Sequence, residues 1–396
     1  MPLPSPFHLR IEKLCTSFRW KDWAGYHAVS SFDHSHEREY VAFRQAAGVI
    51  DVSPLYKYEV RGRDAGRFLS QVMARDITRL GVGRVTYCCW CDDEGKVVDD
   101  GTVTRWGEEH YRVTAAEPSL RWFEQGMQGQ DVTIEDSSQR IAALALQGPR
   151  SRAVLADCSD APLDRLEFFR ATTARLDGVE VGITRTGYTG DLGYEIWIDA
   201  HDALAVWDAV IDAGRAHGLE PAGLDALDMT RIEAGFLMLD VDYYSAPREV
   251  LESRKSTPFE LGLGWTVHLE RDPFVGQAAL VAEQRRGVAW NLVGLEADWQ
   301  ELEALYERYG MPVSLPAAAS RDALPIYRGS EQVGRATSHM WSPLLKKQIA
   351  LASLRAEAAV AGTDLAIEHT VEFERCRVAV KVVKMPFFDP LRKRQP

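Results

Sequence analysis

The sequence predicts an α+β protein of two or three domains whose last part is a small β-barrel. The chain has 396 residues, of which 46% are hydrophobic, and this supplies material for more than one buried core. Stretches with the period-2 alternation of strands lie between stretches with the apolar stripe of helices. From Trp290 onward, strand-like runs follow one another through short loops, which is typical of a small barrel.

Residues 37–147 predict short helices and strands that follow one another closely. The expected elements are a helix over 37–47, strands over 49–54 and 56–61, a helix over 65–73, strands over 85–90, 96–105 and 110–115, a helix over 119–127 and a strand over 141–147. Gly48 is placed as the C-cap of the first helix and Asp64 as the N-cap of the second, because these residue types favour those positions. The acidic turn at 92–95 makes the strands on either side of it a β-hairpin.

The pattern of residues 179–309 predicts two strands, followed mainly by helices. The expected elements are strands over 179–186 and 194–198, helices over 202–217 and 276–285, and a helix within 221–235. Asp225 is placed as the cap of the helix within 221–235. The polar stretch 237–258 has weak periodicity and is expected to form a long ordered loop, and 299–309 looks like an acidic helical insertion in the barrel.

The stretch 183–198 joins a glycine-rich turn to a strand that carries a carboxylate beside an aromatic residue. Glycines at 187, 190 and 193 permit positive φ and close backbone approach, so a sharp turn is expected. In the strand that follows, Glu195 and Trp197 share one face, and residues 194, 196 and 198 share the other. Glu195 could therefore hold a flat polar heterocycle by accepting two N–H bonds. The alternative is a β-hairpin whose Glu195 faces solvent.

Charge and hydropathy exclude several classes of function. The formal net charge is −12, which argues against a nucleic-acid-binding surface, and the basic tail 392–394 is expected to be solvated. No apolar run reaches the ~18 residues of a membrane span, and the N-terminus lacks the pattern of a secretory signal. The cytoplasm is therefore the expected location, with the cysteines reduced.

The cysteines and histidines do not predict a metal site. Cys88, Cys89 and Cys91 cluster, but adjacent strand residues point to opposite faces, and the paired spacing typical of zinc ligands is missing. His34 and His36 would face the same way on a strand, yet a polar loop is the favoured interpretation of that segment. We therefore expect no metal.

Eight short segments, taken in their order along the chain, resemble the motifs of a single protein family. They are Gly48–Ser53, Gly95–Asp100, Ala145–Pro149, Arg185–Glu195, Pro221–Leu224, Arg231–Gly235, Thr337–Pro343 and Lys384–Phe387. Together they resemble motifs of the glycine-cleavage T-protein family, which comprises folate-dependent aminomethyltransferases and related folate-dependent demethylases. The most specific segment is Arg-Thr-Gly-Tyr-Thr-Gly-Asp-Leu-Gly-Tyr-Glu at 185–195, where the family has Arg-Thr-Gly-Tyr-Thr-Gly-Glu-x-Gly-x-Glu.

The resemblance implies a three-domain cloverleaf with a discontinuous first domain and a C-terminal β-barrel domain. Tetrahydrofolate lies in a hole at its centre. The implied domains are 1–57 with 142–245, 58–141 with 246–285, and 286–396. The implied cofactor is therefore tetrahydrofolate, and the implied activity is a one-carbon transfer.

The resemblance also assigns folate-site residues. Glu195 matches the carboxylate that grips the pterin ring, and Asp100, the second residue of an aspartate pair, matches the catalytic carboxylate near the folate nitrogens. Tyr87 matches a tyrosine near the folate and is also a candidate proton donor. The remaining matches to folate-binding positions are Tyr188, Trp265 and Thr114, the last at a position where the family often has asparagine. Without the resemblance, Asp99–Asp100 would be a hairpin strand with one solvent-facing carboxylate.

Departures from the family motifs concern the side of the site that receives the donor. Pro54-Leu55 replaces His-Met, and Leu227 replaces an arginine of the aminomethyltransferases. The segment 240–256 is longer than the usual connection and contains Tyr243 and Tyr244. We therefore expect Tyr243, Tyr244 and Leu55 to line a donor site.

These departures favour a demethylase, which moves a methyl group from a small O-, N- or S-methyl compound to N5 of tetrahydrofolate. Transfer to N5 needs two reactants held in near-attack geometry and a group that orients the folate, a role that suits Asp100. A neutral ether donor also needs a proton for its leaving group, from Tyr87, Tyr243, Tyr244 or water. The first alternative is the aminomethyltransferase of glycine cleavage, which would dock a lipoyl carrier protein. The second is a non-catalytic folate-binding protein.

Overall fold

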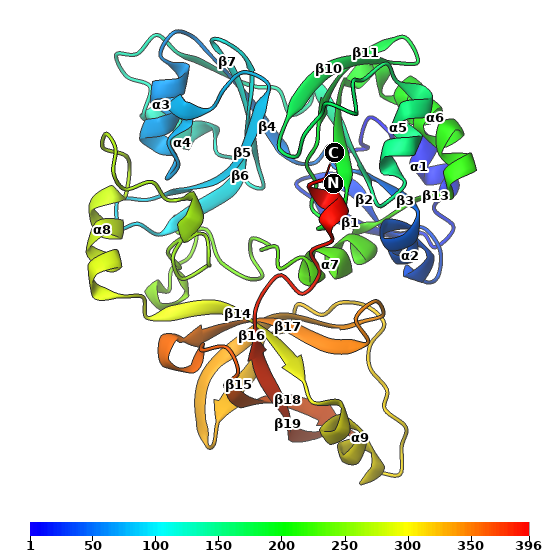
Figure 1. Cartoon of the computed structure of the whole chain (residues 1–396), viewed down its shortest axis with the longest axis vertical. Coiled ribbons are helices and arrows are strands. Elements are labelled where there is room, and N and C mark those ends of the chain that lie inside the picture. Colours follow the sequence, from blue (N-terminus) through cyan, green and yellow to red (C-terminus); the bar gives the residue numbers. More distant parts are fainter. Residues whose placement is uncertain (396) are drawn as a thin grey trace.

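The computed structural model describes residues 1–395 and has three lobes (Figure 1). One lobe is built on a six-stranded sheet, the second on a five-stranded sheet, and the third is a closed barrel. The barrel begins at Trp290, as predicted. Within the described residues, no helix is both long and apolar enough to cross a membrane.

The six-stranded sheet has an apolar cluster on each face. Its strands, in spatial order, are β10 (Ala171–Leu176), β11 (Val179–Thr184), β12 (Gly193–Asp199), β9 (Ile141–Gln147), β3 (Ala47–Asp51) and β13 (Leu219–Pro221). Helices α1 (His8–Leu14), α5 (Ser151–Cys158) and α6 (Ala203–Gly214) cover one face, and α2 (Glu37–Gln45) and α7 (Leu224–Glu233) cover the other. Ile196 joins the first cluster and Trp197 the second, which confirms the alternation predicted for β12.

The five-stranded sheet is also covered on both faces. Its spatial order is β5 (Arg84–Cys91), β6 (Val97–Gly107), β7 (His110–Ala115), β4 (Tyr56–Arg61) and β8 (Thr133–Asp136). Helices α3 (Ala65–Val72) and α4 (Leu120–Gln125) pack on one face, and the segment 237–274 packs on the other, followed by α8 (Gln277–Arg286). Cys88 faces the helices and Cys89 faces the segment 237–274, so adjacent cysteines point apart as expected.

The barrel is closed by pairing of β14 with both β17 and β19. Its strands are β14 (Trp290–Ala297), β15 (Leu324–Arg328), β16 (Glu331–Ser342), β17 (Lys347–Arg355), β18 (Asp364–Val371) and β19 (Glu374–Val383). The predicted insertion is helix α9 (Trp299–Glu307), which lies between β14 and β15. A separate hairpin, β1 (Arg19–Trp23) with β2 (Tyr26–Ser31), precedes the six-stranded sheet.

Two predicted caps are wrong, and the reason in both cases is close packing at a glycine. Gly48 lies inside β3, where a Cβ would meet the Phe43 ring at 2.6 Å. Helix α7 has Gly223 as its N-cap, where a Cβ would lie 2.4 Å from the carbonyl oxygen of Ser30. Asp225 sits in the first turn instead and pairs with Arg19 and Lys21 of the β1–β2 hairpin.

The cap placed at Asp64 is correct in position but not in its hydrogen bonds. Asp64 is the N-cap residue of α3, yet its side chain makes no capping bond there. Its Oδ2 instead accepts the N–H of Asp131 at 2.9 Å. Asp64 therefore ties the start of α3 to the segment that leads into β8.

The basic C-terminal tail is not solvated, which corrects the sequence-based expectation. The chain runs from the barrel back to the six-stranded sheet (red in Figure 1). Arg392 donates two hydrogen bonds of 2.7 Å to the buried carboxylate of Asp191, 201 residues earlier. The Lys393 ammonium is buried over the ring of Phe236, 5.0 Å from its centroid. Local sequence patterns carry no information on partners this distant.

Candidate functional site

Asp100 lies in β6, and both of its carboxylate oxygens accept a tyrosine hydroxyl. Tyr87, on the neighbouring strand β5, donates to Oδ2 over 2.7 Å. Tyr243, from the loop 237–258, donates to Oδ1. Within residues 1–395, the Asp100 carboxylate forms no salt bridge, and only burial and the two tyrosines shift its pKa. The site therefore holds a carboxylate that no cation neutralises.

Asp99, the preceding residue of β6, shares the Tyr243 hydroxyl with Asp100, over 3.4 Å to its Oδ1, but its other partners are backbone groups. Its side chain is fully buried. Its oxygens accept the backbone N–H groups of Asp100 at 2.8 Å, Ala116 at 3.1 Å and Glu117 at 3.0 Å. These bonds fix β6 to the end of β7, which makes Asp99 a structural residue beneath Asp100.

Burial controls the protonation of this group. It raises the pKa of Asp100, and hydrogen bonds from Tyr243 and Tyr87 partly offset that rise. Burial, followed by the negative charge of Asp100, raises the pKa of Asp99 well above its ordinary value. Burial also raises the pKa of both tyrosines. The tyrosines thus remain hydroxyl donors at neutral pH.

Glu195 lies in β12, between β9 and β11, rather than on a solvent-facing hairpin. Its Oε2 accepts the hydroxyls of Thr186 at 2.5 Å and Thr184 at 3.3 Å. No hydrogen bond reaches Oε1 from any other described residue. Burial raises the pKa of Glu195, and the two threonines lower it in part. One oxygen is therefore held in place while the other is available to a ligand with N–H groups.

Two aromatic pairs flank Asp100. Tyr87 stacks against Trp265, with ring centroids 6.0 Å apart and planes inclined by 24°. Tyr188 stacks against Phe236 at 5.6 Å, and its hydroxyl donates to the carbonyl of Leu237. Burial raises the pKa of Tyr188, the charge of Arg231 lowers it in part, and the charge of Asp100 raises it. Flat rings beside carboxylates are what a heterocyclic ligand requires.

Three of the predicted site residues, Thr114, Tyr244 and Leu55, have contacts other than Asp100. The Thr114 hydroxyl bonds to the Thr102 hydroxyl at 2.6 Å, within the β6–β7 pair. Tyr244 is half-buried beneath the guanidinium of Arg254, 5.7 Å from its ring centroid. Leu55 packs against the same apolar cluster as Leu227. The folate role of Thr114 and the donor roles of Tyr244 and Leu55 stay predictions without a contact to Asp100.

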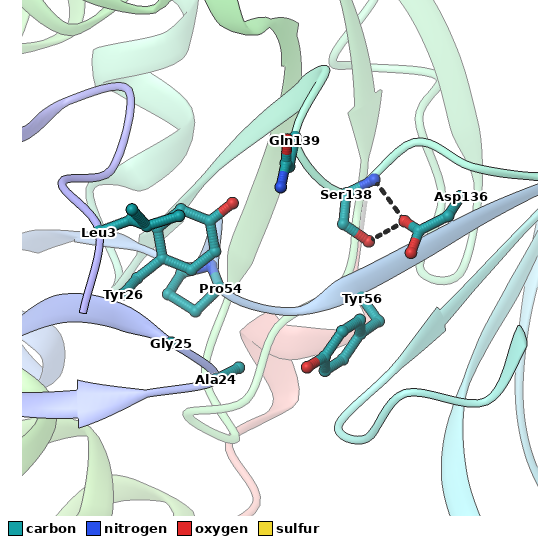
Figure 2. A pocket seen from close by; sticks show the side chains of 9 residues that line it. All are labelled: Leu3, Ala24, Gly25, Tyr26, Pro54, Tyr56, Asp136, Ser138 and Gln139. Atoms are coloured by element: carbon teal, nitrogen blue, oxygen red, sulfur yellow. Dashed lines mark hydrogen bonds between the residues drawn. The ribbon is translucent and has the colours of Figure 1, made fainter. Parts of the chain in front are cut away.

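A cavity of about 430 Å³ is lined by other residues (Figure 2). It is lined by Leu3, Ala24, Gly25, Tyr26, Pro54, Tyr56, Asp136, Ser138 and Gln139. The Asp136 carboxylate accepts the N–H of Ser138 at 2.9 Å and its hydroxyl at 2.5 Å. No predicted site residue lines this cavity. Within residues 1–395, no group of three or more His, Cys, Asp or Glu side chains is placed to hold a metal ion.

Comparison with known proteins settles the family. The N-terminal domain of the glycine cleavage T-protein family matches residues 13–271, and its C-terminal barrel domain matches residues 292–389. An aminomethyltransferase from Bacillus subtilis (strain 168) is 34% identical over 373 residues, which are 93% of this chain and 94% of the relative. The chain belongs to the glycine cleavage T-protein family.

Two further comparisons concern the fold and the range of relatives. The crystal structure of glycine cleavage system aminomethyltransferase T from Bartonella henselae matches with a TM-score of 0.82 and 24% identity, over 98% of this chain and 99% of that one. A trimethylamine-oxide aldolase from Ruegeria pomeroyi is 35% identical over 369 residues, which are 90% of this chain and 43% of the relative. The expected T-protein fold is confirmed.

Membership of the T-protein family also confirms the cofactor and the class of activity. The chain is a tetrahydrofolate-dependent one-carbon transferase, so the interpretation as a non-catalytic folate-binding protein is not supported. The predicted domain boundaries and site residues stay predictions. The half-free carboxylate of Glu195 and the exposed ring of Trp265 fit a flat ring that carries N–H donors.

Sequence reasoning missed the residues that hold the carboxylates in place. Thr184 and Thr186 fix Glu195, and the indole N–H of Trp197 donates to Thr184 at 3.1 Å. The sequence did contain a signal for the two threonines, because residues two apart in an extended segment, such as 184 and 186, point to the same side. The bond from Tyr243 to Asp100 carried no such signal, since the two residues are 143 positions apart.

Proposed function

We propose that this T-protein is an aminomethyltransferase, which moves the one-carbon unit of an aminomethyl donor to tetrahydrofolate. The observation that carries the proposal is the Asp100 carboxyl group, which accepts hydrogen bonds from Tyr87 and Tyr243 and forms no salt bridge with residues 1–395. The names of the curated relatives support the aminomethyl donor, since several of those at 32–34% identity are aminomethyltransferases. They support it better than the free methyl donor expected from the sequence.

In the proposed mechanism, Asp100 stabilises charge at the nitrogen that receives the carbon. Tetrahydrofolate supplies that nitrogen as a nucleophile. A nitrogen that forms a new bond to carbon becomes positively charged, and a nearby carboxylate both stabilises this charge and can accept the N–H proton. The two tyrosine hydroxyls keep the Asp100 side chain in one orientation. Oε1 of Glu195 would accept N–H bonds from the pterin and hold it in register.

A second candidate function is methyl transfer from a small free donor to give 5-methyl-tetrahydrofolate. Two observations favour it: Leu227, which stands where aminomethyltransferases have an arginine, is buried in an apolar cluster, and the longer segment 240–256 supplies Tyr243 to Asp100. The Ruegeria relative also names a small methylated compound, trimethylamine oxide. This reaction would need no lipoyl carrier protein, whereas the aminomethyl reaction would.

Product identity separates the two candidates. The enzyme is incubated with tetrahydrofolate and either an aminomethyl-lipoyl carrier protein or a panel of O-, N- and S-methyl compounds, and the folates are identified by mass spectrometry. We expect ammonia and 5,10-methylene-tetrahydrofolate from the carrier. Formation of 5-methyl-tetrahydrofolate from a free methyl donor, with none from the carrier, would replace the first proposal by the second. The Asp100→Asn variant is the control for uncatalysed condensation.

A further inference from the structure

Arg112, on β7, lies between two indole rings that come from different lobes. Its Cζ is 5.5 Å from the ring centroid of Trp106, on β6, and 5.6 Å from that of Trp197, on β12. Distances below about 6 Å are those of cation–π contacts. Strands β6 and β7 belong to the five-stranded sheet, and β12 belongs to the six-stranded sheet. The guanidinium therefore connects the two lobes.

A buried carboxylate holds this guanidinium in place. The Nε of Arg112 donates to Oε1 of Glu59, on β4, over 2.6 Å. The second oxygen of Glu59 bonds to the ring of His110. Burial acts to raise the pKa of Glu59, but the hydrogen bonds and charges of His110 and Arg112 hold that pKa at about 2. Glu59 is therefore ionised at neutral pH, and it binds the edge of the guanidinium while the faces remain for aromatic rings.

The two indoles lie at neighbouring positions of the six-stranded sheet. Trp106 packs against Gly182, on β11, where an added Cβ would be 2.8 Å from the indole ring. Gly182 pairs with Trp197 across β11 and β12. Both tryptophans also belong to one apolar cluster. A residue larger than glycine at 182 would push Trp106 away, so close packing fixes where the Arg112 guanidinium meets Trp197.

Trp197 is connected to Glu195 by hydroxyl groups. Its indole N–H donates to the Thr184 hydroxyl over 3.1 Å. That hydroxyl lies 2.7 Å from the Thr186 hydroxyl and 3.3 Å from Oε2 of Glu195, and Thr186 donates to the same Oε2 over 2.5 Å. An indole N–H can only donate, so the proton of Thr184 is left for Thr186 or Glu195. The hydrogen bonds therefore run from Trp197 toward Oε2 of Glu195.

We propose that Arg112 is a positioning residue for Glu195 and acts on it through Trp197. The proposal rests on the folate role of Glu195 in the proposed function and adds the group in the opposite lobe that orients this carboxylate. By holding the Trp197 ring, Arg112 fixes the indole N–H against Thr184. The threonines then keep Oε2 in one place, which leaves Oε1 directed at the N–H groups of the pterin. Arg112 itself does not contact the folate.

A double-mutant cycle with Glu195→Ala tests this connection, with affinity for tetrahydrofolate measured by calorimetry. Arg112→Gln keeps a donor for Glu59 but removes the charge between the indoles, and it should weaken binding about fivefold. Arg112→Lys keeps the charge and should bind within about twofold of wild type. In the Glu195→Ala background, Arg112→Gln should change affinity by less than about twofold. Arg377→Gln is the matched control, because Arg377 lies over the Tyr327 ring in the barrel.

The outcomes separate positioning from general support of the fold. A loss that is equal with and without the Glu195 carboxylate, or one that Arg112→Lys does not recover, would overturn the proposal. Equal affinity of wild type and Glu195→Ala would overturn the folate role of Glu195 itself and this proposal with it. Should Arg112→Gln not fold, Trp197→Phe keeps a ring for Arg112 and removes the N–H. It should weaken binding about fivefold in wild type and less than twofold in Glu195→Ala, and unchanged affinity in wild type would overturn the proposal.

Discussion

The two ends of the candidate folate site each present a carboxylate, but the two carboxylates are held differently. Glu195, in the lobe with the six-stranded sheet, has one oxygen fixed by Thr184 and Thr186, and the other accepts no hydrogen bond from residues 1–395. Asp100, in the lobe with the five-stranded sheet, has a tyrosine hydroxyl on each oxygen. Burial raises the pKa of both. The difference lies in how much hydrogen-bonding capacity each leaves for a ligand.

This difference indicates separate tasks for the two ends. A carboxylate with a free oxygen can accept N–H bonds in the ground state, which gives affinity. A carboxylate already bonded on both oxygens adds less to ground-state binding, and its negative charge acts mainly when positive charge develops nearby. We therefore expect Glu195 to affect binding and Asp100 to affect turnover. The following predictions are tests of that division.

The largest effect is expected from Asp100→Asn, which keeps the shape and removes the charge. Turnover should fall by about 10²–10⁴-fold, the usual contribution of a positioned acid or base. Affinity for reduced folate should change little, because the amide can still accept one tyrosine hydroxyl. Steady-state kinetics combined with calorimetry measures both quantities. A variant that loses folate affinity but turns over normally would reverse the assignment of the two carboxylates.

Much of this site follows from local sequence pattern. Strands 56–61, 110–115 and 141–147 have the predicted bounds. The first two alternate apolar and polar residues, the third is a continuous apolar run, and each ends at a turn. The hairpin of β5 and β6 brings Tyr87 close enough to bond Asp100, and β12 alternation turns Glu195 away from Ile196. These features depend on residues that are close together in the chain, so they can be predicted from a single sequence.

The rest depends on contacts between distant segments. The sequence pattern around Arg392 does not predict its hydrogen bond to Asp191, which belongs to a distant segment of the chain. Gly48 looks like a helix cap because glycine favours that position, yet the Phe43 ring requires a residue without a Cβ inside a strand. Likewise the weakly periodic loop 237–258 gives no sign that Tyr243 will be buried against Asp100. Only the packed chain determines such partners.

The second largest effect is expected from Glu195→Ala, and it should appear in binding. Loss of the carboxylate leaves N–H donors of the ligand unpaired, which costs about 1–3 kcal/mol, or roughly 5–150-fold in affinity. The rate at saturating folate should be less affected. Calorimetry with tetrahydrofolate measures the affinity, and Glu180→Ala, on the exposed part of β11, is the matched control. Unchanged affinity in Glu195→Ala would remove Glu195 from the site.

A smaller effect, of about tenfold in turnover, is expected from Tyr243→Phe. The Tyr243 hydroxyl lowers the pKa of Asp100 by bonding its charged form. Its removal should raise that pKa, so that Asp100 becomes protonated at a higher pH than in wild type. The acid limb of the pH–rate profile should therefore move upward in pH. Tyr244→Phe, whose ring lies under Arg254 instead, should leave the profile in place, and a shift in both variants would argue against a direct effect.

The smallest effect on turnover, less than about twofold, is expected from Asp99→Asn, which should instead cost stability. Asparagine can satisfy only part of the three N–H donors around Asp99, a loss of about 1–3 kcal/mol. Burial raises the pKa of Asp99 above its unfolded value, so the folded state binds the extra proton and wild-type stability falls as pH rises from about 4 toward the folded pKa. Asn does not titrate, so the stability gap between wild type and Asp99→Asn should narrow as pH rises. Denaturant unfolding at several pH values measures the gap. A gap that widens with pH would mean that Asp99 is ionised in the folded protein and that its N–H donors outweigh its burial.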